Sequence, residues 1–103
     1  MSTASKGRGR EWQSRDMLKA HGYDVGRFAG SKGGDFHGCD LIAMRSVMSV
    51  PPYVILVSCK CNAWPGREEM RELTRLSTRY PRPGHEVQIH RYDDRKEVRI
   101  RVV

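Results

Sequence analysis

The sequence predicts an α/β protein with a central mixed β-sheet flanked by helices, in the element order αβββαββ. Three observations support this prediction. Residues 53–61 begin with a run of β-branched and other apolar residues that stops on a lysine, which is typical of a buried central strand. Helical spacing of apolar residues occurs on both sides of this run, in residues 11–21 and 67–80. Two alternating segments, 87–90 and 98–102, flank a polar turn and predict a terminal β-hairpin with one wet face.

Length and composition limit the number of domains and the kind of partner. A chain of 103 residues fits one domain, which we assign to residues 11–103 after a flexible basic arm over residues 1–10. The 19 Lys and Arg against 12 acids give a net charge of +7. This balance favours nucleic acid as partner, then an anionic membrane, although a merely basic protein would show it too.

Cysteine number and hydropathy indicate the compartment. An odd number of cysteines, three, does not suggest a disulfide framework. The sequence has neither an apolar run long enough for a bilayer nor a signal-peptide core, so no membrane association is expected. We expect an intracellular protein, in the cytoplasm or nucleoid, or in the host cytoplasm if a virus encodes it.

The first third of the chain supplies candidate phosphate contacts. Lys6, Arg8 and Arg10 lie in the expected arm, which suits either DNA contact or simple solvation. Residues 30–34 predict a flexible loop without Walker A spacing, in which Ser31 and Lys32 could donate to a DNA phosphate.

The helix predicted over residues 11–21 ends before Gly22, a good left-handed terminator. Glu11 lies seven residues before the apolar Leu18, so both project from nearly the same side. Glu11 would then face the edge of the sheet, or it is an ordinary first-turn glutamate that complements the helix dipole.

The centre of the chain predicts a hydrolytic site. Lys60 ends the apolar run, where a buried lysine needs a carboxylate or a cleft. Alternation places Ser58 and Lys60 on one face of this strand, with Cys59 and Cys61 on the other. A hairpin from the preceding strand, residues 40–44, would bring Asp40 close to Lys60. The following predicted helix carries an arginine at every fourth position, a row that is either a solvated face or a DNA-facing ridge: Arg67, Arg71, Arg75 and Arg79.

The sequence resembles the archaeal-type Holliday junction resolvases of the PD-(D/E)XK nuclease superfamily over roughly residues 6 to 80. The resemblance rests on the order of short motifs: Lys6-Gly7 before Glu11, His21-Gly22-Tyr23, Arg27-Phe28-Ala29-Gly30-Ser31, Asp40-Leu41-Ile42-Ala43, and Ser58-Cys59-Lys60. It implies a restriction-endonuclease-like core and a homodimeric endonuclease that nicks opposing strands of four-way DNA junctions. The cofactor would be Mg²⁺, with Mn²⁺ able to substitute, and no small-molecule cofactor.

The resemblance also implies roles for individual residues. Glu11 would match the acidic residue on the first helix, Asp40 the metal-binding aspartate and Lys60 the lysine of the E-x-K element. Ser31 would match a loop serine near the scissile phosphate, and the backbone carbonyl of Cys59 could supply a second metal oxygen. Arg27, next to this loop motif, joins Lys6, Arg8, Arg10 and Lys32 as a predicted DNA contact.

One departure from the family pattern matters. Ser58 stands where the family has the glutamate of E-x-K, so the metal site lacks one negative charge. Either the Ser58 hydroxyl serves through a water, or Asp35, Glu68 or Glu69 replaces the acid, or the protein binds DNA with weak or no activity. A duplex-directed restriction or repair endonuclease is a further alternative, because one fold serves many substrates.

The sequence also contains a possible zinc-ligand set and possible interface residues. His37, Cys39, Cys59 and Cys61 could bind zinc, but their spacing within apolar strands favours reduced cysteines packed beneath the helices. For a dimer interface, apolar residues expected to be exposed are the candidates: Phe36, Tyr53 and Trp64.

Overall fold

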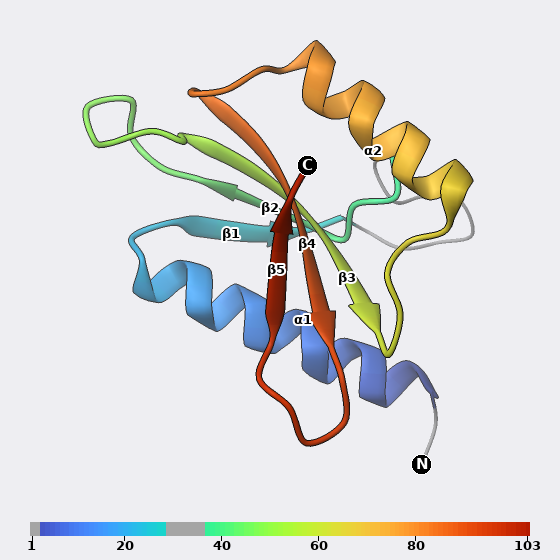
Figure 1. Cartoon of the computed structure of the whole chain (residues 1–103). Coiled ribbons are helices and arrows are strands. Elements are labelled where there is room, and N and C mark those ends of the chain that lie inside the picture. Colours follow the sequence, from blue (N-terminus) through green and yellow to red (C-terminus); the bar gives the residue numbers. More distant parts are fainter. Residues whose placement is uncertain (1–2, 29–36) are drawn as a thin grey trace.

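The computed structural model describes residues 3–28 and 37–103, with side chains described from residue 9 onward. Along this part of the chain the elements are α1 (Thr3–Ala20), β1 (Asp24–Arg27), β2 (Leu41–Met44), β3 (Val54–Cys61), α2 (Arg67–Arg79), β4 (His85–Tyr92) and β5 (Arg99–Val102). Their order, αβββαββ, is the predicted one (Figure 1).

The strands form one mixed five-stranded sheet in the spatial order β1-β2-β3-β4-β5. β1–β2, β2–β3 and β4–β5 are antiparallel pairs, whereas β3 and β4 run parallel from Val54↔His85 to Cys61↔Tyr92. Parallel neighbours cannot be joined by a tight turn, and α2 provides the crossover between them. The predicted mixed sheet and terminal hairpin are therefore confirmed.

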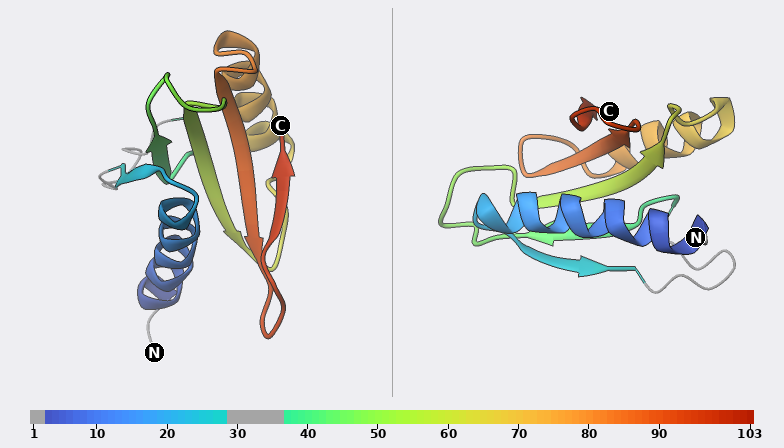
Figure 2. Two further views of the ribbon diagram at one scale, coloured as in Figure 1. Left: turned by 90° about the vertical axis from the view of Figure 1, so that its left-hand side faces the viewer. Right: turned by 90° about the horizontal axis from the view of Figure 1, so that it is seen from below.

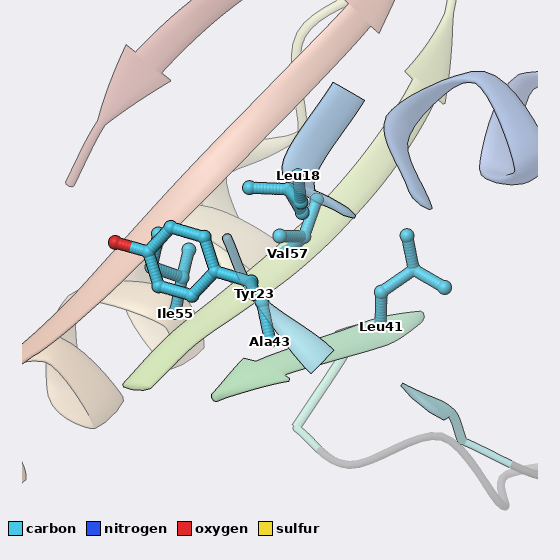
Figure 3. Packing of buried hydrophobic residues seen from close by; sticks show 6 residues of the cluster. All are labelled: Leu18, Tyr23, Leu41, Ala43, Ile55 and Val57. Atoms are coloured by element: carbon cyan, nitrogen blue, oxygen red, sulfur yellow. The ribbon is translucent and has the colours of Figure 1, made fainter. Parts of the chain in front are cut away.

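Alternate residues of β3 pack into two cores on opposite faces of the sheet. Ile55 and Val57 belong to the core that includes Leu18 of α1 (Figure 3). Leu56 belongs to the other core, with Leu73 of α2. Each helix thus covers one face of the sheet, as Figure 2 shows from two directions. This arrangement gives β3 buried side chains on both faces, which explains the unbroken apolar run of residues 54–57 at its start.

The first helix is longer than predicted. We expected it to begin at about Glu11 after a flexible arm, but α1 begins at Thr3, so residues 3–10 are helical. This segment lacks an apolar stripe and contains Gly7 and Gly9, which are poor helix formers, so its sequence gave no helical signal. Among the described residues, no helix is long and apolar enough to cross a membrane.

The expectation of one wet face on the terminal hairpin was wrong for its first strand. No residue of β4 is exposed, because this strand lies inside the sheet between β3 and β5. All four residues of β5 are exposed, because β5 forms an edge of the sheet. Alternation was visible in both segments, but only the strand order decides which of them has neighbours on both sides.

Candidate active site at the end of strand β3

Asp40 is fixed against β3 by two hydrogen bonds. Its backbone N–H donates to the Val57 carbonyl at 2.7 Å, and its Oδ2 accepts the backbone N–H of Cys59 at 2.7 Å. The carboxylate thus accepts a strand N–H that a backbone carbonyl would accept in a regular ladder. The predicted hairpin between the two strands is present, and it places Asp40 beside residues 58–60 of β3.

Side-chain alternation is broken at Asp40. Cys39 packs in the core beneath α2, whereas Leu41, two residues further on, packs in the core beneath α1. Such a break is what an extra residue, a β-bulge, produces in a strand, and bulges often redirect a side chain next to a functional site. The Asp40 carboxylate therefore lies at the boundary between the two faces of the sheet.

Lys60 lies on the α2 face of the sheet, as the alternation from Leu56 predicts. Its Nζ forms an ion pair with Oε2 of Glu69 in the first turn of α2. The side chains of Lys60 and Glu69 are 28% and 48% exposed. The lysine at the end of the buried strand does face a carboxylate, but this carboxylate comes from α2.

Glu11 approaches the same end of the sheet from α1. Its Oε1 accepts a hydrogen bond from Nε of Arg27 at 2.6 Å, and its side chain is only 15% exposed. Arg27 pairs with Leu41 in the register of β1 and β2, and the N–H of Phe28 donates to the Asp40 carbonyl at 3.0 Å. The Glu11 side chain therefore points toward the part of the sheet where Asp40 lies. The positive charge of Arg27 balances the charge of the Glu11 carboxylate.

The thiol of Cys59 lies close enough to the carboxylates of Asp40 and Glu11 for their charges to affect its pKa. Burial, and to a smaller extent the nearby charges of Asp40 and Glu11, together raise the pKa of Cys59 to about 12. The thiol donates a hydrogen bond to Oγ of Ser14 at 3.6 Å. Asp40 and Glu11 thus lie around the same residue of β3, and Cys59 stays a neutral thiol that does not compete with oxygen ligands for a hard cation.

Ser58 has an unusual environment. Its side chain is fully buried, and its Oγ has no hydrogen-bond partner among the described residues. A buried hydroxyl without a partner is rare in folded proteins and calls for an explanation. Ser58 lies on the same face of β3 as Lys60, the face that α2 covers.

The four potential zinc ligands do not form a site. Cys39 is buried beneath α2, Cys59 bonds to α1, and Cys61 is exposed. His37 Nδ1 lies 2.7 Å from Oε1 of Glu72. Within residues 3–28 and 37–103, no group of three or more His, Cys, Asp or Glu side chains could hold a metal ion. The expectation of cysteines packed beneath helices fits Cys39 and Cys59, and it was wrong for Cys61.

The predicted DNA contacts are described only in part. Arg10 lies 3.4 Å from Oδ1 of Asp94 and 5.5 Å from the Tyr92 ring centroid, and Arg27 pairs with Glu11. Both arginines therefore have carboxylate partners within the chain. The remaining predicted residues lie outside the described residues or have side chains outside them: Lys6, Arg8, Ser31, Lys32 and Asp35.

The apolar residues expected at a dimer interface are less exposed than predicted. Tyr53 and Trp64 are partly buried, and Trp64 packs against the core beneath α2. Phe36 lies outside the described residues. The loop between β2 and β3 instead exposes large apolar side chains, including Met48 at 91%. Position in the connecting loop, and not residue type, decides this exposure.

A buried polar network beneath α1 is not predicted by the sequence patterns. Ser14 Oγ lies 2.8 Å from Nδ1 of His90, and it also bonds to the Tyr92 hydroxyl and accepts the Cys59 thiol. Ser14 and His90 are both fully buried. The only signal was the presence of His90 and Tyr92 at alternate positions of a predicted strand, which does not identify their partner on α1.

The mixed five-stranded sheet with one helix on each face defines an α/β fold. The fold is shared with the crystal structure of Hjc from Archaeoglobus fulgidus, described as a Holliday junction resolvase from an archaeal hyperthermophile. The TM-score is 0.70 at 17% sequence identity, and the match covers 93% of this chain and 76% of the other. No protein-family model and no curated protein matches the sequence. At this identity the likeness establishes the fold.

Proposed function

We propose that this chain is a metal-dependent endodeoxyribonuclease that resolves four-way DNA junctions. The observation that carries this proposal is the hydrogen bond of the Asp40 carboxylate to the backbone of Cys59, next to Lys60, in a fold shared with a junction resolvase. DNA binding alone requires no carboxylate at this position. The net charge of +7 supports a polyanionic substrate.

The oxygen donors at the end of β3 fit a hard divalent cation. Asp40 and Glu11 offer carboxylates, and the backbone carbonyl of Cys59 offers a further oxygen. Mg²⁺ commonly uses one or two carboxylates and completes its coordination with waters and phosphate oxygens, so a cluster of three acidic side chains is not needed. We therefore propose Mg²⁺ as cofactor, with Mn²⁺ as a substitute and no small-molecule cofactor.

Each residue has a distinct part in the proposed reaction. A bound divalent cation polarises the scissile phosphate and lowers the pKa of an attacking water. Asp40 would hold this cation, and Glu11 would bind its outer shell. Lys60 would orient the attacking water or stabilise the charge that develops on the phosphate. Paired nicks in opposing strands require two such sites, so a homodimer is part of the proposal.

Two observations favour a second candidate, a protein that binds branched DNA without cutting it. Ser58 removes the carboxylate expected two residues before Lys60, and Lys60 is already paired with Glu69. A restriction or repair endonuclease would differ from both of these candidates, because it would cleave linear duplex DNA.

The proposal predicts cleavage of an end-labelled four-way junction in Mg²⁺ at paired, symmetrical positions, with linear duplex of the same sequence left intact. EDTA and the Asp40→Asn and Lys60→Ala substitutions should each reduce the rate by at least about 100-fold, since each removes a group acting on the reacting phosphate. Denaturing gel electrophoresis of the products measures the rate and the positions of the nicks.

The outcomes separate the candidates. Tight junction binding without cleavage in Mg²⁺ or Mn²⁺ would favour the binding protein. Equal cleavage of junction and duplex would favour a duplex-directed nuclease. Full activity of the Asp40→Asn protein would exclude the proposed site altogether.

A further inference from the structure

We propose that Glu69 provides the carboxylate that position 58 lacks, and that a divalent cation competes with the Lys60 ammonium for it. This inference rests on the proposed metal-dependent function and adds to it one specific ligand and an exchange of partners. The sequence alone did not distinguish Glu69 from Glu68 or Asp35.

The short connection between β3 and α2 brings Glu69 to the end of β3. β3 ends at Cys61 and α2 begins at Arg67 after Gly66, so Glu69 lies in the first turn of the helix (Figure 1). Its Oε2 contacts Nζ of Lys60. The carboxylate of the helix thus reaches the side chain that ends the S-x-K element.

The other two acids are less suited to this role. Glu68 is exposed and forms no ion pair with any described residue. Asp35 lies outside the described residues. Glu72, one turn further along α2, is engaged by His37 and Arg75. Glu69 is therefore the acid for which the structure records a contact with the candidate site.

Ser58 gives independent support for a ligand at this place. Its hydroxyl is fully buried, has no partner among the described residues, and lies on the α2 face of β3 together with Lys60. Buried polar groups are normally satisfied by protein or by bound water. If a cation binds nearby, the Ser58 hydroxyl could form a hydrogen bond with one of the water molecules that coordinate it. The hydroxyl would then have a partner.

The exposure of the ion pair allows an exchange of partners. Lys60 and Glu69 are both in partial contact with solvent, at 28% and 48%, and such pairs contribute little to stability. A divalent cation beside Asp40 would attract the Glu69 carboxylate more strongly than a single ammonium does. Loss of its partner would leave Lys60 available to a phosphate oxygen, so metal binding would prepare the lysine for the reaction.

Binding of Mn²⁺ to the DNA-free protein tests this inference without reference to activity. Free Mn²⁺ is measured by electron paramagnetic resonance for the wild type and for Glu69→Gln, Lys60→Met and Asp40→Asn. The matched control is Glu68→Gln, which removes the same charge from the neighbouring residue of the same helical turn. Circular dichroism and thermal unfolding establish that each variant is folded.

We expect Glu69→Gln to weaken Mn²⁺ binding at least tenfold and Glu68→Gln to change it less than twofold. Lys60→Met should tighten binding severalfold, because it removes the competing cation. Equal affinities of Glu69→Gln and Glu68→Gln would overturn the ligand role, and weaker binding by Lys60→Met would overturn the exchange. Loss of binding in Asp40→Asn, with Glu69→Gln unaffected, would leave the proposed function intact and reject only Glu69. No Mn²⁺ binding by the wild type would count against the proposed function itself.

Discussion

Cys59 contacts both Asp40 and helix α1. Its backbone N–H binds the carboxylate of Asp40, and its thiol donates to Ser14 of α1. Cys59 therefore links the candidate ligand Asp40 to the polar network beneath α1.

The protonation of His90 follows from its partners. The amide nitrogen of Gln88 donates to Glu86, so the Gln88 carbonyl oxygen accepts the N–H of His90 Nε2 at 2.8 Å. Nδ1 of His90 then accepts the Ser14 hydroxyl proton, and the Tyr92 hydroxyl donates to Ser14. Burial lowers the pKa of His90 from 6.5 to about 4, which keeps the ring neutral in this network.

The buried neutral His90 should make the protein less stable in acid. Between pH 6.5 and about 4 the unfolded chain binds a proton at position 90 that the folded chain does not bind. The free energy of unfolding should therefore fall as pH is lowered through this window, by up to roughly 3 kcal/mol from this group. Urea unfolding across this pH range measures the effect.

The matching variant is His90→Gln, which retains hydrogen-bonding groups but does not titrate. Its unfolding free energy should depend less steeply on pH than that of the wild type in the same window. Identical pH dependence of the two proteins would show that His90 is not buried in its neutral form.

At the scale of elements, α1 contributes both to stability and to the candidate site. Leu18 anchors the helix in the core over β2 and β3, while Ser14 and Glu11, one and two turns earlier, reach the polar network and Arg27. The packing of α1 on the sheet thus positions the carboxylate of Glu11 beside Arg27. A helix that loosens should lose this carboxylate from the site as well.

The Leu18→Ala substitution tests whether α1 is anchored through Leu18. Leu18 is 5% exposed, so its truncation should lower the free energy of unfolding by about 2–5 kcal/mol. The control is Lys19→Ala at the adjacent exposed position, for which a change within about 0.5 kcal/mol is expected. Denaturant titration measures both. Similar losses for the two variants would mean that α1 is not anchored through Leu18.

At the scale of the whole molecule, the excess positive charge is distributed among paired and solvated groups. Arg91 and Arg99 share the carboxylate of Asp93, whose pKa is lowered chiefly by the hydrogen bond from Arg91. Both guanidinium groups also lie near the Trp64 ring, at 5.3 and 5.7 Å from its centroid. A DNA partner would therefore meet several arginines already held in place by the chain.

The salt dependence of junction binding tests the role of this charge. Each phosphate contact that is lost should reduce the slope of log affinity against log salt by about 1. We expect this reduction for Arg10→Ala and no reduction for Lys19→Ala, which removes the same charge nine residues further along α1. Fluorescence anisotropy of a labelled junction in EDTA measures the slopes. Equal slopes for the wild type and Arg10→Ala would remove Arg10 from the interface.

The order of elements and most of the candidate residues could be predicted from local patterns in the sequence. The apolar run of β3 and the helical spacing of α2 are local patterns, so they could be read without partners. Asp40 beside the end of β3 followed from the hairpin, because an antiparallel connection fixes which residues face one another. The start of α1 was predicted wrongly because residues 3–10 carry no apolar stripe, and the exposure of β4 was predicted wrongly because it depends on strand order.

The contacts between side chains of different elements could be identified only from the fold. The pairing of Lys60 with Glu69, the network from Ser14 to His90, and the redirected Asp40 all join residues from different elements. Such contacts arise from the placement of helices on the sheet and leave no periodic trace along the chain. The sequence offered three candidates for the acid that is missing at position 58 and could not distinguish among them. The fold places one of them, Glu69, in contact with Lys60.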